Sequence, residues 1–196
     1  PVLNNRIDRF GGSFENRTRL LRETLARIKE DVPQVFITTR MNAYDAISYP
    51  WGFGVSKEDY RVPDLTEPQR LVGELQKLGV RVLNISIGNP YFNPHFGRPY
   101  DFPIKGMEPP RDHPLAGIER FMGIVRELQK EHPDCALVAS GYSWLRHLMP
   151  PVAAALIRTG GATLLGIGRG AFAYPWQVND ILETGRMDPA QCCVTC

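Results

Sequence analysis

The cysteines near the end of the chain have the spacing of metal ligands. Cys192, Cys193 and Cys196 all lie within the last five residues, and two residues separate Cys193 from Cys196. This C-x-x-C spacing lets both thiolates bind one centre, as in zinc sites and iron–sulfur sites. A redox-active C-x-x-C would open a helix after a strand, and nothing in this stretch matches that pattern. A chance cluster is the alternative. If the pair does hold a metal, its remaining ligands lie beyond residue 196.

An arginine stands at the end of the first predicted strand. The apolar run VFITTRMNA contains Arg40, followed by Met41 and Asn42. An arginine late in an apolar strand needs partners for its many N–H donors. Those partners are either a buried ion pair, with Asp45 as the candidate, or an anion or carbonyl of a ligand. Position alone does not decide between the two.

Small residues close two later predicted strands, at Ser140-Gly141 and at Gly166-Ile167-Gly168-Arg169. Residues of this size let backbone N–H groups approach a ligand closely. The guanidinium of Arg169 adds a fork of donors that suits phosphate. In eight-stranded barrels, the loops after the last two strands commonly form a phosphate site. These strand ends are therefore candidates for phosphate binding.

A regular alternation of helices and strands would position these residues. Apolar residues recur at helical spacing in segments that begin with capping residues, and short β-branched runs separate them. Ser13 and Thr66 are the expected caps of the first two helices. We expect helices at 13–32, 66–79, 115–131, 145–158 and from 175 to just before 185, and strands at 35–43, 80–88, 136–141 and 162–170.

This order of elements predicts an α/β fold with a parallel sheet. Four βα units form either an open sheet or half of an eight-stranded barrel, and periodicity does not distinguish them. In both folds, ligands bind at the carboxyl ends of the strands. The long loops at 44–65 and 89–114 would shape the substrate pocket there, with His95 and Tyr91 as candidate contacts. Cys135, in the apolar run CALVAS, is expected to be a buried small residue.

Composition excludes several classes of protein. The net charge of +2 over 196 residues is small, and no stretch combines basic with aromatic residues, so we expect no nucleic-acid partner. No apolar run reaches the length of a membrane span, and the opening PVLNNRIDRF lacks the apolar core of a secretory signal. We expect a cytoplasmic protein without a membrane partner. Because the chain starts at Pro1 and stops among cysteines, we expect it to be a piece of a longer protein.

Residues 5–17, NRIDRFGGSFENR, resemble a signature of the old yellow enzyme family of FMN-dependent NAD(P)H oxidoreductases. Members carry N-x-R-x-D-x-[YF]-G-G-S-x-x-N-R after the fourth strand of a (β/α)8 barrel. The resemblance continues in register. The run RMNAYD at 40–45 is similar to the strand-five region, Ser140-Gly141 to the strand-seven phosphate turn, and Gly166-Ile167-Gly168-Arg169 to the strand-eight turn. The terminal cysteines resemble the iron–sulfur branch, which includes 2,4-dienoyl-CoA reductase and trimethylamine dehydrogenase.

The resemblance implies cofactors and roles for residues. Arg40 would bond the flavin ring, and the FMN phosphate would be held by Ser140, Gly141, Gly168 and Arg169. Cys193 and Cys196 would ligate a [4Fe–4S] cluster in the parent protein, with Cys192 as an ambiguous neighbour. The reaction would be hydride transfer from NAD(P)H to FMN and then to an activated alkene. The family's catalytic residues belong upstream of Pro1, so no catalytic residue is assigned.

The sequence therefore predicts the C-terminal half of an FMN barrel, strands five to eight, at residues 1–188. A truncated iron–sulfur segment follows at 189–196. Without the N-terminal half barrel, half of the flavin site and the proton donor would be missing, so we expect the isolated chain to be inactive. Its first and last strands would be unpaired edges, so we expect it to self-associate. A second hypothesis is a non-redox module that binds a phosphate ligand and holds structural zinc at the cysteines. A third is a structural fragment without a ligand.

Overall fold

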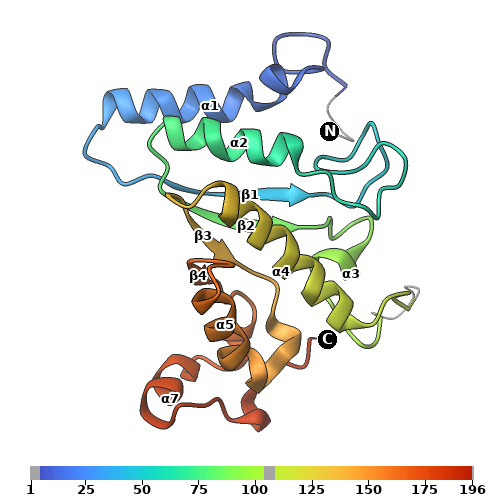
Figure 1. Cartoon of the computed structure of the whole chain (residues 1–196), viewed down its shortest axis with the longest axis vertical. Helices are drawn as coiled ribbons and strands as arrows, with labels where there is room; N and C mark the ends of the chain where they lie inside the picture. The colour runs from blue at the N-terminus through green and yellow to red at the C-terminus, as the bar shows by residue number, and fades with distance from the viewer. Residues whose placement is uncertain (1–4, 104–108, 196) are drawn as a thin grey trace.

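The structure is a computed structural model that describes residues 5–103 and 109–195. Its centre is one sheet of four parallel strands that lie in sequence order (Figure 1). The register places Arg40 opposite Asn84, and Asn84 opposite Val138, so the strands end along one common edge. The predicted parallel α/β fold is confirmed. The strands are β1 (Thr38–Tyr44), β2 (Val82–Ile87), β3 (Ala136–Ala139) and β4 (Leu164–Leu165).

Helices connect the strands, and none of those in the described ranges is long and apolar enough to cross a membrane. The long connecting helices carry the apolar spacing seen in the sequence. The described helices are α1 (Phe14–Asp31), α2 (Thr66–Lys77), α3 (Pro94–Gly97), α4 (Pro114–Glu131), α5 (Met149–Arg158), α6 (Gly170–Ala173) and α7 (Gln177–Thr184), with 3₁₀ segments η1 (Ser143–Leu148) and η2 (Pro189–Gln191).

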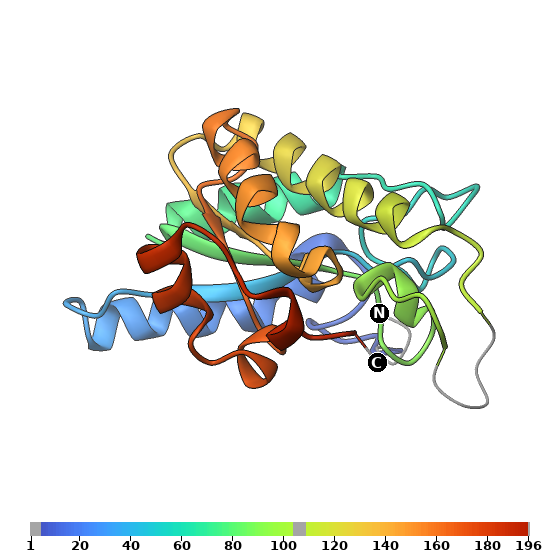
Figure 2. The same cartoon turned by 90° about the horizontal axis from the view of Figure 1, so that it is seen from below.

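One face of the sheet is buried under helices, and the other is only partly covered. The helices α2, α4 and α5 lie along the same face (Figure 2). Leu83 and Ile85 point to that face and are fully buried, because alternate residues of a strand point to opposite faces. On the other face Asn84 and Ser86 are half-buried and Arg40 is exposed. A doubly wound sheet has helices on both faces, whereas a (β/α)8 barrel has them only outside. The arrangement is that of part of a barrel, with the partly covered face as its inner wall.

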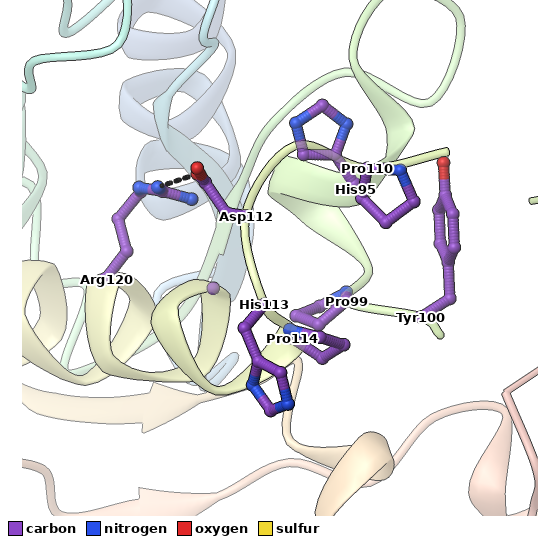
Figure 3. A pocket seen from close by; sticks show the side chains of 9 residues that line it. His95, Pro99, Tyr100, Pro110, Asp112, His113, Pro114 and Arg120 are labelled. Atoms are coloured by element: carbon purple, nitrogen blue, oxygen red, sulfur yellow. Dashed lines mark hydrogen bonds and ion pairs between the residues drawn. The ribbon is translucent and has the colours of Figure 1, made fainter. Parts of the chain in front are cut away.

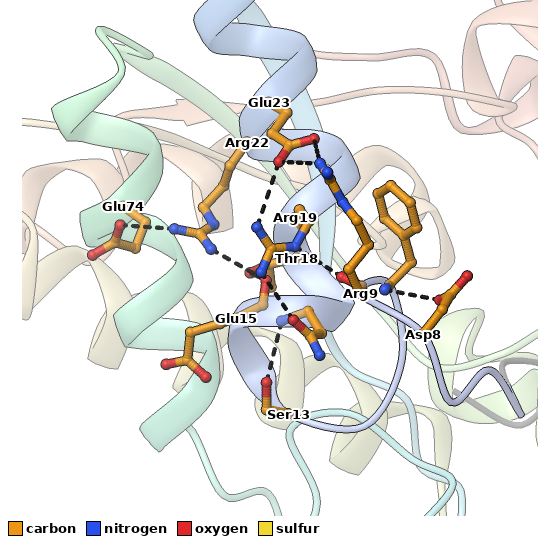
Figure 4. A network of polar contacts seen from close by, with 11 residues as sticks. Asp8, Arg9, Ser13, Glu15, Thr18, Arg19, Arg22, Glu23 and Glu74 are labelled. Atoms are coloured by element: carbon orange, nitrogen blue, oxygen red, sulfur yellow. Dashed lines mark hydrogen bonds and ion pairs between the residues drawn. The ribbon is translucent and has the colours of Figure 1, made fainter.

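A polar network holds the turn before α1 against the helix (Figure 4). Ser13 caps α1 as predicted, since its Oγ accepts the N–H of Asn16 at 3.3 Å. Arg9 forms an ion pair with Glu23 at 2.6 Å, and Arg19 donates to the carbonyl oxygen of Arg9 at 2.8 Å. The turn and the helix are thus joined by side chains from both.

The predicted cap of α2 is wrong. Thr66 is the first residue of the helix, and the carboxylate of Asp64 accepts the N–H of Thr66 at 3.0 Å. A carboxylate two residues upstream satisfies this first donor, so the Thr66 hydroxyl is not needed as a cap. An ion pair between Arg17 and Glu67, at 2.6 Å, then joins the start of α2 to α1.

The predicted helix at 145–158 is also wrong at its start. The chain first forms η1, breaks at Arg146 with a φ of 51°, and enters α5 only at Met149. Pro150 and Pro151 explain this boundary, because a residue without an N–H fits only in the first turn of an α-helix. The predicted helix that ends before Gly185 is confirmed, and Gly185 closes α7 with a φ of 75°.

The predicted strand at 162–170 is much shorter in the structure. β4 consists of two residues, and in the described chain it pairs only with β3. Gly168 and Arg169 therefore lie in the turn beyond β4 rather than in a strand. Cys135, by contrast, is 1% exposed, and its predicted burial is confirmed.

Candidate functional site

Arg40 has no ion-pair partner among the described residues. Asp45 was the partner considered from the sequence. Its carboxylate instead accepts hydrogen bonds from Nδ2 of Asn42 at 2.5 Å and from the N–H of Phe53 at 2.8 Å. The ion-pair interpretation is therefore wrong within the part of the chain that the structure describes. The Arg40 side chain is exposed on the inner face of β1, where it is available to an anion or a carbonyl.

Asn84 links the middle of the inner wall to the end of β3. Its Nδ2 donates to Oγ of Ser140 at 3.0 Å, whereas its Oδ1 is buried and has no partner in the described chain. A buried acceptor without a partner is costly, so it marks a place where another group is needed. Sequence reasoning missed Asn84. The signal was a polar side chain at the inward position of the alternating strand VLNISI.

The turn after β3 has little space for a side chain, and the turns after β3 and β4 both carry backbone N–H groups without an acceptor in the described chain. Gly141 has a φ of 97°, and a Cβ there would lie 2.6 Å from the ring of Phe121. Gly168 faces open space, with nothing within 4 Å of a Cβ. Among the described residues, the backbone N–H groups of Gly141, Gly168 and Arg169 donate to no acceptor. Three unused donors at neighbouring strand ends are suited to an anion.

Positive charge gathers at this edge of the sheet. Partial burial, together with the charges of Arg98 and Arg40, lowers the pKa of Arg169, while the thiol group of Cys193 acts in the opposite direction. Arg98 and Arg40 thus each lie within electrostatic reach of Arg169. None of them forms an ion pair with a described acidic residue. Arg98 was not predicted, because its approach depends on how the loop after β2 folds back.

A hydrogen-bonded clamp fixes the start of the cysteine segment, which we define as residues 188–195. Tyr174 is fully buried, and its hydroxyl donates to the carboxylate of Asp180 in α7. The same hydroxyl accepts the N–H of Asp188 at 3.1 Å. Asp188 in turn caps η2 by accepting the N–H of Ala190 at 2.9 Å. The last barrel helix and the cysteine segment are therefore held together by one phenol.

Two of the terminal cysteines have different surroundings. Cys192 is 8% exposed, donates its thiol to the carbonyl oxygen of Asp188 at 3.3 Å, and has a pKa raised mainly by burial. Cys193 is half-buried, and its Sγ accepts the N–H of Thr195 at 3.4 Å. Cys196 lies outside the described residues. Within the described ranges, no three His, Cys, Asp or Glu side chains form a metal site.

The described residues of the loop after β2 enclose a cavity that is too small for a substrate. His95 is half-buried against Phe96 and lines a cavity of about 10 Å³ with Tyr100 and others (Figure 3). That volume holds one water at most. Burial lowers the pKa of His95. Tyr91, the other candidate contact, is 97% exposed.

Solved structures identify the class of fold. An amine oxidase for 6-hydroxypseudooxynicotine from Pseudomonas geniculata N1 matches with a TM-score of 0.63 and 22% identity, over 92% of this chain and 22% of that one. An old yellow enzyme homologue from Zymomonas mobilis matches with a TM-score of 0.58 and 18% identity, over 95% of this chain and 42% of that one. The chain therefore has the fold of part of a (β/α)8 barrel.

Sequence comparisons show similarity to a family of flavin oxidoreductases. Residues 1–53 match the model of the NADH:flavin oxidoreductase / NADH oxidase family. The whole chain is 27% identical over 198 residues to an NADH oxidase from Thermoanaerobacter brockii and 25% identical over 197 residues to a dimethylamine dehydrogenase from Hyphomicrobium. The chain is therefore similar to proteins of the NADH:flavin oxidoreductase family, with the match to the family model confined to residues 1–53. All of this chain aligns, but it spans only 25% and 23% of those two relatives.

Proposed function

We propose that the chain is the C-terminal half of an FMN-binding barrel in a longer NAD(P)H oxidoreductase. That protein would reduce an activated alkene or a related small molecule by hydride transfer. The observation that carries the proposal is a set of donors at one edge of the sheet that have no partner among the described residues. They are the N–H groups of Gly141, Gly168 and Arg169 and the guanidinium groups of Arg40 and Arg169. Similarity to a family of flavin oxidoreductases supports the redox reaction.

The described residues fit FMN. Its phosphate carries negative charge and acceptor oxygens, which suit free backbone N–H groups and an arginine fork. Ser140, Gly141, Gly168 and Arg169 would hold the phosphate, and Arg40, exposed on the inner wall, would bond the flavin ring. The positive charge of Arg40 would stabilise negative charge on that ring by a preorganised interaction. When bound, FMN supplies the hydride acceptor and donor, with NAD(P)H as the cosubstrate.

The cysteine segment fits a [4Fe–4S] cluster in the parent protein. Cys193 is a free, half-buried thiol whose sulfur already accepts a backbone N–H, an arrangement suited to a thiolate ligand. We propose Cys193 and Cys196 as ligands and 189–196 as the start of the iron–sulfur segment after a barrel half at 1–188. Cys192, buried and bonded to Asp188, is the less suitable ligand.

The remaining parts of the enzyme would come from outside the chain. We propose an N-terminal half barrel as the partner that covers the inner wall and completes the flavin site. The catalytic proton donor is not assigned to any residue here. The loops at 44–65 and 89–114 would contact the small-molecule substrate, since both follow strands at the edge where Arg40 lies. The non-redox zinc module is less favoured, because the matched relatives are oxidoreductases.

The test is the absorbance spectrum of the full-length parent protein, purified without oxygen. We expect a flavin band with a broad iron–sulfur shoulder, both bleached by NAD(P)H. A colourless protein that binds phosphate, or one with zinc and no iron, would overturn the proposal in favour of the binding module.

A pair of variants then tests the phosphate site. Arg169→Met removes a charged donor, a loss of about 1.5–3 kcal/mol, which corresponds to about 10- to 100-fold weaker FMN binding. Arg158→Met is the matched control, because Arg158 ends α5 and forms no hydrogen bond or ion pair among the described residues. Equal FMN affinity in the two variants would contradict the assignment of Arg169.

A further inference from the structure

The backbone of Arg98 is fixed at the carboxyl end of the sheet. Gly88 ends β2 with a φ of 75°, and a Cβ there would lie 2.4 Å from the backbone nitrogen of Gly97. The two backbones therefore touch, which holds α3 directly on the end of the strand. On the other side of Arg98, Pro99 packs on Gly117 of α4, where a Cβ would lie 2.8 Å from the proline ring. Arg98 stands between these two close contacts.

The side chain of Arg98 reaches the end of the cysteine segment. Its Nη2 donates to the carbonyl oxygen of Thr195 at 3.2 Å, across 97 residues of sequence. Thr195 is 7% exposed and has a φ of 58°, a conformation that β-branched residues rarely adopt. The N–H of Thr195 points back to Sγ of Cys193. Two hydrogen bonds therefore fix the turn at 193–195: Arg98 binds the carbonyl oxygen of Thr195, and Sγ of Cys193 accepts the N–H of the same residue. This turn lies beside the loop that carries α3 (Figure 2).

The guanidinium of Arg98 also contributes charge. It lies within electrostatic reach of Arg169, which in turn is within reach of Cys193. No described acidic residue forms an ion pair with Arg98. A positive charge near an iron–sulfur cluster favours its reduced form, which is the more negative one, and so raises its reduction potential.

We infer that Arg98 is a positioning residue for the iron–sulfur segment: it ties the loop after β2 to the turn that presents Cys193 and adds positive charge beside the cluster. The inference rests on the proposed function, since it needs a cluster in the parent protein. It goes beyond that function in giving the barrel loop a role in retaining the cluster and setting its potential.

The experiment uses the full-length parent protein, purified without oxygen, with Arg98→Met, Arg98→Lys and the control Arg111→Met. Arg111 is exposed and makes no hydrogen bond or ion pair among the described residues. Three quantities are measured: iron and FMN per chain, the rate at which a chelator removes iron, and the midpoint potential of the cluster from an EPR-monitored redox titration.

We expect Arg98→Met to release iron about 10- to 100-fold faster than wild type, as for other outer-shell partners of metal ligands. Its midpoint potential should fall, because a positive charge has been removed. Arg98→Lys keeps the positive charge but lacks the planar guanidinium group. Relative to Arg98→Met, it should therefore bring the midpoint potential of the cluster closer to wild type than the rate of iron release. Arg111→Met should match wild type in all three measurements.

The outcomes distinguish failure of the proposed iron–sulfur cluster from failure of the proposed role of Arg98. A wild-type parent with FMN but no iron overturns the cluster assignment, and the role of Arg98 falls with it. A wild-type parent with both cofactors, together with wild-type iron release and potential in Arg98→Met, overturns the role of Arg98 alone. If Arg98→Met does not fold, Arg98→Lys decides: iron release equal to that of wild type contradicts the positioning role.

Discussion

Substitutions at Gly141 and Gly168 distinguish the effect of a side chain on folding from its effect on phosphate binding. Alanine at Gly141 would have to adopt a φ of 97°, at a cost of about 1–2 kcal/mol for an L-residue in the left-handed region. Its Cβ would also lie 2.6 Å from the ring of Phe121, which is 1% exposed and has little room to move. Overpacking of this kind adds about 1–3 kcal/mol. We expect Gly141→Ala to lose about 2–5 kcal/mol of folding free energy.

The assay is thermal unfolding of the full-length protein, followed by circular dichroism and by release of flavin fluorescence. For a domain of this size the loss corresponds to a melting temperature lower by about 5–15 °C. Gly168→Ala is the matched variant, because its Cβ would meet nothing within 4 Å and its φ is not positive. It should melt within a few degrees of wild type and still bind FMN more weakly, since the methyl group occupies the side from which a phosphate would approach. Equal melting of the two variants would refute the steric reasoning.

Four further outcomes are expected. Tyr174→Phe leaves the N–H of Asp188 and the carboxylate of Asp180 without the phenol, at about 1–3 kcal/mol; hydrogen exchange in the cysteine segment should accelerate, and unchanged protection would contradict the clamp. In the metal-free protein at pH 8, iodoacetamide should modify Cys193 before Cys192, because burial raises the pKa of Cys192; mass spectrometry reads the order, and equal rates would count against it. Arg40→Met should lower the reduction potential of bound FMN in a spectral titration, with Arg158→Met unchanged. The isolated chain should self-associate in light scattering through its uncovered sheet edges, and a well-folded monomer would argue against this.

The order of helices and strands along the chain could be predicted from the sequence, because it depends on local signals. Apolar runs and helical spacing gave the four βα units, and the small residues at Ser140-Gly141 and Gly168 marked the turns that carry unused donors. The start of α5 could have been placed correctly, because Pro150 and Pro151 fit only in the first turn of an α-helix. The short β4 could not, because ATLLGIGRG carries the same apolar pattern as the longer strands and nothing in the structure explains why only two of its residues pair.

The residues that sequence reasoning missed depend on contacts between distant segments. The role of Asn84 depends on its hydrogen bond to Ser140, which lies 56 residues later in the chain. Arg98 joins a turn 97 residues away, and no periodicity links the two. The ion pair expected between Arg40 and Asp45 failed for a similar reason, since the backbone of Phe53 and the amide of Asn42 occupy Asp45. Local patterns therefore locate the edge of the sheet, and tertiary contacts decide its chemistry.

The contact between Gly88 and Gly97 sets a boundary for protein engineering. The two backbones leave no room for a side chain, so any insertion between them would move Arg98 away from Thr195. Among the described residues of that stretch, Tyr100 is the last buried one before α4. A loop exchange intended to alter the substrate should therefore keep residues 88–100 intact and begin after Tyr100. Exchanges made in that way would change the substrate side while preserving the connection to the cysteines.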